Sequence, residues 1–180
     1  MAKAGWNFEN VAASFCEAAI DPSYWCKAME IAAEESDACG AIMFPVRGRL
    51  PALPHTESLD ASFENYLVGG WVHRDQRYRA LPTVARRGLA TELDFTTPGK
   101  MLRDPYYQEF LRPHKLRWSA LVKVAAGDEF WILSLQRTIE QGPFQPSELV
   151  RLKSLSSALG SAAALAKTLG EQRQLFRPSR

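Results

Sequence analysis

DPYYQEFLRPHKLRW-SALVKVAAGDEFWILSLQRT-IEQGPF, from Asp104 to Phe144, is the stretch that decides the fold. Its first part carries aromatic residues at helical spacing and predicts a helix that stops at Pro113. Its middle part places Gly127 and Asp128 between two runs of β-forming residues, which predicts an antiparallel hairpin with a tight turn. Breaker residues at its end lead into a long final helix.

The hairpin has two unlike faces. A two-residue turn sets Val124 opposite Trp131 and Val122 opposite Leu133. One face is then almost wholly apolar, with Trp118, Ala120, Val122, Val124, Trp131, Leu133 and Leu135. The other face mixes polar and apolar side chains: Ser119, Leu121, Lys123, Phe130, Ile132, Ser134 and Gln136. We expect helices to cover the first face, whereas the second suits a pocket wall or a half-solvated sheet face.

The rest of the chain alternates between helical and strand patterns. Helices are predicted over 8–19, from Asp21-Pro22 to the acidic cluster at 34–37, over 58–71, from Thr97-Pro98 to Pro113, and from Pro146 to Leu169. Strands are predicted over 38–46, 50–53 and 91–95, with a turn at 47–49. The first of these reads as buried on both faces, and Pro45 places its end at an edge or a bend. Residues 74–88 show no clean period. The sequence therefore predicts an α+β fold, with a small antiparallel sheet flanked by helices.

Composition places the chain among single globular domains. It has 180 residues, 46% of them hydrophobic, and a formal net charge of +2. Its charges alternate in sign and form no basic stripe, which argues against direct nucleic-acid binding. No apolar run approaches the roughly 20 residues that span a bilayer, and the first residues lack the apolar core of a signal peptide. We therefore expect a cytoplasmic protein.

The chain carries no recognisable catalytic motif. Its serines form no nucleophile elbow, its carboxylates form no obvious pair, and its three histidines are scattered. Cys16, Cys26 and Cys39 are odd in number and far apart, so we expect neither a disulfide framework nor a zinc site. Cys26, near a helix start, is the best candidate for a redox-sensing thiol. We expect no cofactor, no metal and no enzymatic activity.

Bulky aromatic residues and a few polar ones are the candidates for a ligand site near the sheet. They are Tyr66, Trp71, Asp75, Phe95, Tyr106, Trp118, Trp131 and Arg137. Such aromatic residues fill core volume in most proteins, and they also line pockets, so both interpretations stay open. Arg137 ends the apolar face of the hairpin, where its guanidinium is placed either to hold a ligand carboxylate or to reach solvent.

The final helix has a seam of leucine and alanine at spacings of three and four. Its members are Leu152, Leu155, Leu159, Ala162, Ala166 and Leu169. This spacing is typical of a heptad seam that forms a homodimer, and equally of a helix that packs on its own core.

The order of these elements resembles a PAS/GAF-like fold. The strings YYQEFLRPHKLRW (106–118), GDEFWILSLQR (127–137) and GPF (142–144) resemble the sensor half of certain LuxR-type transcriptional regulators. The resemblance extends from about residue 25 to 169. It implies a sensory domain at 1–169 that binds a small molecule and signals through the helix at 146–169, with 170–180 as a tail or truncated linker. It also implies that DNA is bound only through a helix-turn-helix module absent from this chain.

Related autoinducer-binding domains hold an acyl-lactone head group with a tyrosine, a tryptophan and an aspartate. Tyr66, Trp71 and Asp75 lie in the corresponding region, but their spacing departs from that pattern, so the resemblance does not name the ligand. The leading hypothesis is a domain that senses a small, partly apolar molecule. The alternatives are a ligand-free dimerisation or protein-interaction module and, with less support, a small enzyme.

Overall fold

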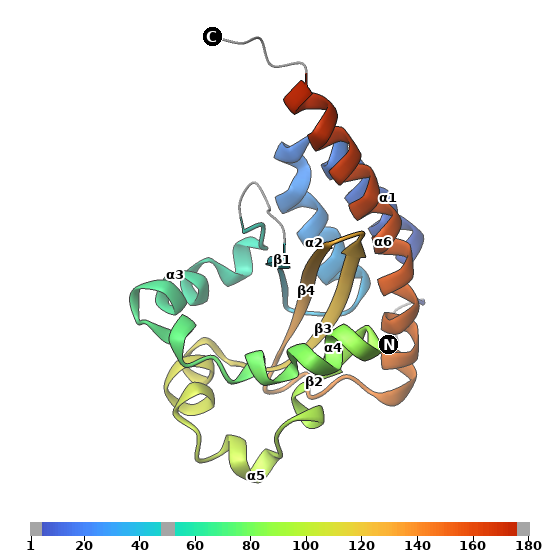
Figure 1. Cartoon of the computed structure of the whole chain (residues 1–180). Helices are drawn as coiled ribbons and strands as arrows, with labels where there is room; N and C mark the ends of the chain where they lie inside the picture. The colour runs from blue at the N-terminus through green and yellow to red at the C-terminus, as the bar shows by residue number, and fades with distance from the viewer. Residues whose placement is uncertain (1–4, 48–52, 176–180) are drawn as a thin grey trace.

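A four-stranded antiparallel sheet lies between two helical layers in the computed structural model, which describes residues 5–47 and 53–175 (Figure 1). The strands follow the spatial order β1-β4-β3-β2. Their bounds are Gly40–Arg47 for β1, Leu89–Thr91 for β2, Leu116–Ala126 for β3 and Glu129–Thr138 for β4. The predicted α+β fold class is confirmed.

The central hairpin has the predicted register. Val124 pairs with Trp131, and Val122 pairs with Leu133. Gly127 opens the turn with φ +58°, a conformation that residues with a Cβ rarely adopt. Alternation along the two strands and the choice of turn residues agree, which is why the pairing was predictable.

Three long helices cover the apolar face of the hairpin (Figure 1). They are α1 (Phe8–Ile20), α2 (Trp25–Glu35) and α6 (Pro146–Leu175). Their small and branched side chains form one buried cluster with Ala120, Val122, Val124, Trp131, Leu133 and Leu135. Burying each large apolar side chain contributes roughly 1.5–3 kcal/mol, so this layer holds the sheet and the terminal helix together. The expected cover on this face is confirmed.

The predicted start at Asp21-Pro22 is also confirmed. The Asp21 carboxylate accepts a hydrogen bond of 3.0 Å from the backbone N–H of Ser23, and a short 3₁₀ turn, η1 (Pro22–Tyr24), leads into α2. Aspartate as cap followed by proline at the first helical position is a common way to begin a helix. After α2, Asp37 takes a left-handed φ of +53° and turns the chain into β1.

The second layer consists of short helical elements on the opposite face of the sheet (Figure 1). In chain order they are η2 (Glu57–Leu59), α3 (Asp60–Val68), η3 (Trp71–His73), η4 (Gln76–Ala80), α4 (Leu81–Arg87), η5 (Glu92–Asp94), α5 (Pro98–Met101), the π-helical η6 (Tyr106–Leu111) and η7 (Arg112–His114). Residues 74–88, which lack a periodic pattern, form two of these elements.

Two predictions in this layer were wrong. The helix expected from Thr97 to Pro113 is broken, because Pro105 disfavours helical backbone before it and Asp104 bonds the N–H of Tyr106 at 2.9 Å instead. The strand expected over 91–95 ends at Thr91, because the Asp94 carboxylate accepts the N–H of Thr91 and closes a 3₁₀ turn.

Strand β1 behaves as expected at Pro45. It lies at the edge of the sheet, and its register against β4 shifts between Pro45 and Arg47. Its predicted burial on both faces holds only in its first half, since its last residues are exposed. The predicted turn at 47–49 and strand at 50–53 lie largely outside the described residues. No helix among the described residues is long and apolar enough to cross a membrane.

Candidate ligand-binding site

A cavity of about 500 Å³ lies between the mixed face of the sheet and the second helical layer. Strands β1, β3 and β4 form its floor, and α3, η4 and η6 form most of its walls. Most of its lining is apolar, including Ile42, Phe44, Leu59, Phe63, Leu67, Val72, Phe110, Leu111 and Leu121. Binding sites for small molecules have volumes of roughly 300–1,000 Å³ and a similar apolar character.

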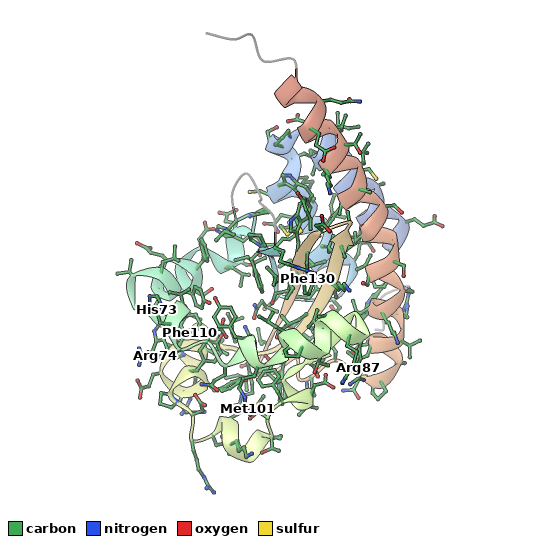
Figure 2. The ribbon with its side chains drawn as sticks, viewed as in Figure 1. His73, Arg74, Arg87, Met101, Phe110 and Phe130 are labelled. Atoms are coloured by element: carbon green, nitrogen blue, oxygen red, sulfur yellow. The ribbon has the colours of Figure 1, made fainter. Side chains whose placement is uncertain are left out.

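Aromatic rings stiffen the wall of this cavity. The Phe110 ring, labelled in Figure 2, lies with its centre 5.4 Å from that of Tyr106 and 5.7 Å from that of Tyr66 on α3. Trp71 also stacks on Phe110, with ring centres 5.5 Å apart and an interplanar angle of 21°. These contacts hold the rings against one another and leave the space beside them unfilled.

Asp75 is the centre of the polar end of the cavity. Its Oδ2 accepts a hydrogen bond of 2.9 Å from the Tyr66 hydroxyl, and its Oδ1 accepts one of 2.7 Å from the backbone N–H of Arg77. Burial raises the pKa of Tyr66, and the neighbouring Asp75 carboxylate raises it further. The Tyr66 hydroxyl therefore stays protonated and donates to Asp75.

A buried ion pair lies next to Asp75. Arg77 Nε donates to Glu92 Oε1 at 2.8 Å, and Arg77 Nη1 donates to Gln136 Oε1 at 2.9 Å. The backbone N–H and hydroxyl of Ser119 donate to the same Glu92 carboxylate at 2.7 and 2.8 Å. The guanidinium is thus engaged by protein acceptors, and Asp75, Arg77 and Gln136 all belong to the lining of the cavity.

The structure brings three of the eight candidate ligand residues into the cavity lining, namely Tyr66, Asp75 and Tyr106. Trp71 and Trp118 belong to the cluster behind the aromatic wall. Phe95 is half-buried and packs against a separate cluster that contains Ala80 and Val84. These three aromatic residues do not line the cavity.

Trp131 and Arg137 lie on the opposite face of the sheet. Trp131 packs edge-on against Trp25 of α2, with ring centres 6.3 Å apart. Arg137 bonds Glu148 of α6 with two hydrogen bonds of 3.0 Å. Odd-numbered residues of β4 face the long helices, so neither side chain reaches the cavity, and Arg137 is neither in solvent nor placed to hold a ligand carboxylate there.

Trp118 departs from the face predicted for it. It clusters with Tyr106 and Phe110 on the cavity side, although Ala120 on the same strand faces the long helices. Trp118 is the first regularly paired residue of β3 after the register shift between Leu116 and Trp118, and at this end of the strand it meets the aromatic residues of η6.

The seam of the final helix is used mainly inside the chain. Its first four members, Leu152, Leu155, Leu159 and Ala162, are buried against the sheet and α1. Ala166 is partly buried on the same core, and Leu169 is half-exposed. The seam thus serves core packing, and only its last two members retain exposed surface for another chain.

Sequence reasoning missed Arg77, Glu92 and Phe110 as site residues. Arg77 and Glu92 lie in two 3₁₀ turns, 15 positions apart in the sequence, and no local spacing predicts their pairing. Gln136 could have been found, because it lies on the mixed face of the hairpin, for which a pocket wall was one of two interpretations. The structure favours that interpretation over a half-solvated face, because Leu121, Ser134 and Gln136 all line the cavity.

The described residues that line the cavity include two serines, and neither is paired with a histidine or a carboxylate by a hydrogen bond. These serines bond other partners: Ser62 donates to the carbonyl of Leu59, and Ser134 accepts from Gln136. In the described ranges, no group of three or more histidine, cysteine, aspartate and glutamate side chains is arranged to hold a metal ion.

No protein-family model matches the sequence, and no curated protein matches it. Solved structures do match. One is the N-acylhomoserine lactone dependent LuxR-family transcription factor CepR2 from Burkholderia cenocepacia, with a TM-score of 0.58 and 16% identity over 87% of this chain and 92% of that chain. Another is the VqsR LBD domain from Pseudomonas aeruginosa, with a TM-score of 0.58 and 17% identity over 89% of this chain and 96% of that chain.

At these identities the similarity is one of fold, and PAS/GAF-like is an approximate description of it. Both matches cover most of each chain. The chain therefore has the fold of the ligand-binding domains of LuxR-family transcription factors.

Proposed function

We propose that this chain is the ligand-sensing domain of a LuxR-type transcriptional regulator. The observation that carries the proposal is the apolar cavity of about 500 Å³, closed at one end by the polar groups around Asp75. Protein interiors are normally close-packed, so a hollow of this size with a mostly apolar lining needs an explanation. A ligand-free interaction module has no need of such a space, whereas a sensor does.

The lining predicts the chemistry of the ligand. Apolar walls suit an aliphatic chain or ring system, while the Asp75 carboxylate suits a head group that donates an N–H or O–H. Among the described residues that line the cavity, Arg77 is the cation, and Glu92 and Gln136 already engage it, so it is not available to balance a ligand carboxylate. We therefore propose a neutral amphiphile with a hydrogen-bond donor in its head group.

N-acylhomoserine lactones supply a suitable probe, since CepR2 depends on such a molecule and an acylated amine carries both an apolar chain and an amide N–H. The test is a thermal-shift titration of the purified chain with N-octanoylhomoserine lactone, octanamide and octanoate. At a hundred times the dissociation constant, a bound ligand stabilises by about 2.7 kcal/mol. For a chain of this size that raises Tm by about 5–10 °C. We expect this shift with the neutral amides and none with octanoate.

A cavity variant separates specific binding from surface association. Leu121 lies on the floor of the cavity, so Leu121→Phe fills part of the space and should remove the shift. Val150→Phe adds the same ring on the exposed surface of α6 and should leave the shift unchanged. If neither the three probes nor a broad metabolite library stabilises the wild-type chain, the proposed function is wrong.

A further inference from the structure

We infer that Gln136 and Arg137, two consecutive residues of β4, couple the cavity to the start of α6. The inference rests on the proposed function, because it gives an occupant of the cavity a route to the final helix. Consecutive residues of a strand point to opposite faces. Gln136 therefore faces the cavity and Arg137 faces the long helices, and both side chains are buried.

On the cavity side, a continuous series of hydrogen bonds ends at Gln136. Tyr66 donates to Asp75, Asp75 accepts the backbone N–H of Arg77, and Arg77 donates to Gln136 Oε1 at 2.9 Å. The second polar atom of Gln136, Nε2, donates to Ser134 Oγ at 3.0 Å. All five residues line the cavity. An occupant that replaces one of these hydrogen bonds with its own therefore changes how Gln136 is held.

On the helix side, Arg137 holds the first turn of α6. Its two terminal nitrogens donate to the two carboxylate oxygens of Glu148, and its Nε donates to the carbonyl of Asp37 at 3.1 Å. The guanidinium also lies 3.8 Å from the centre of the Phe144 ring. Glu148 Oε2 in turn accepts the backbone N–H of Gln145, the residue before the helix, at 2.6 Å. One carboxylate thus joins the arginine to the helix cap.

We expect this arrangement to have two discrete states. A bidentate pair between a buried guanidinium and a carboxylate is either made or broken, because a partial separation leaves a charge without its partner. A small shift of β4 at Gln136 therefore acts on α6 as a switch between two positions of its first turn. Coupling of this kind is reciprocal: a change at α6 must alter the cavity side by the same free energy.

The first arm of the test perturbs the cavity side and reads the helix. Gln136→Met keeps the volume and removes the acceptor for Arg77. Ile132→Val is the matched control, because Ile132 is a buried residue of the same strand with no polar contact to that network. Hydrogen–deuterium exchange of the full chain without ligand should be roughly fivefold or more faster at residues 149–153 in Gln136→Met than in the control.

The second arm runs in the reverse direction. Glu148→Gln should speed exchange at residues 76–80 of η4, whereas Glu171→Gln, at an exposed site near the other end of α6, should not. A clamp that only held α6 in place would speed exchange at the helix and leave η4 unchanged. Glu148 is not fully buried, so this variant decides the matter if Gln136→Met does not fold.

The inference is overturned if Gln136→Met exchanges like its control at 149–153, or if Glu148→Gln leaves 76–80 unchanged. Neither arm contains a ligand, so its failure is distinguishable from a failure of the proposed function. Probe binding without mutational coupling refutes the inference alone. Coupling in both directions supports it even when none of the three probes binds.

Discussion

Replacing Arg77 by methionine is the sharpest test of the energetics beside the cavity. Arg77 and Glu92 form an ion pair of 2.8 Å whose side chains are 9% and 1% exposed. Methionine keeps most of the apolar stem and removes the guanidinium. Glu92 then retains its hydrogen bonds from Ser119 but loses its cation, and Gln136 Oε1 loses a donor.

The expected loss follows from this burial. Removing one partner of a buried ion pair typically lowers the free energy of unfolding by about 3–5 kcal/mol, because the other charge stays buried without compensation. Arg87 offers a matched control: it pairs with Asp94 at 3.0 Å, but those side chains are 58% and 26% exposed. For Arg87→Met we expect a loss of about 0–1 kcal/mol. The two pairs have nearly the same length, so the comparison contrasts a buried, multiply bonded arginine with an exposed one.

Urea denaturation followed by tryptophan fluorescence measures both losses. With a slope of roughly 2 kcal/mol per molar urea, Arg77→Met should lower the midpoint by about 1.5–2.5 M. The double variant Arg77→Met with Glu92→Gln should be more stable than Arg77→Met alone, because the uncompensated charge is gone. If Arg77→Met costs no more than Arg87→Met, or if the double variant regains nothing, the reasoning about the buried pair is refuted.

Three further predictions test other parts of the fold. Burial would raise the pKa of Glu148, but hydrogen bonds from its arginine partner and from the helix cap hold that pKa below its usual range. The ionised carboxylate therefore stabilises the fold above about pH 4, and this contribution is lost as pH falls through the lowered pKa. Glu148→Gln should therefore flatten the acid limb of a curve of stability against pH. Gly40→Ala should lower the free energy of unfolding by about 1–3 kcal/mol, because its Cβ would lie 2.7 Å from Leu59 Cγ. Gly99→Ala is the control: its Cβ meets nothing within 4 Å, so it should be neutral or slightly stabilising when both variants are compared by thermal denaturation. Leu155→Ala should cost about 2–5 kcal/mol at every protein concentration, since the residue is buried within its own chain; a loss seen only at low concentration would instead indicate a dimer seam.

Local signals explain which parts of the fold were predictable. The hairpin register follows from alternation and one glycine turn, and the second helix follows from an aspartate cap and a proline. Both depend on residues close together in the sequence. The short turns of the second layer depend on single side-chain contacts, such as Asp94 to the N–H of Thr91, which compete with strand and helix patterns of equal local strength.

Residue type was a poor guide to which residues line the cavity, and the reason is physical. Trp131 was chosen because it is large and aromatic, yet the wholly apolar face of a sheet is the one that long amphipathic helices bury completely. The mixed face cannot be sealed in that way, because Ser134 and Gln136 need polar partners. The mixed face is therefore covered by a layer of short helical elements, which supplies Arg77 as a polar partner. This layer does not pack closely against the whole sheet, and the cavity lies between the two. On this sheet, Ser134 and Gln136 of the mixed face line the cavity, whereas Trp131 and Arg137 of the opposite face pack against the long helices.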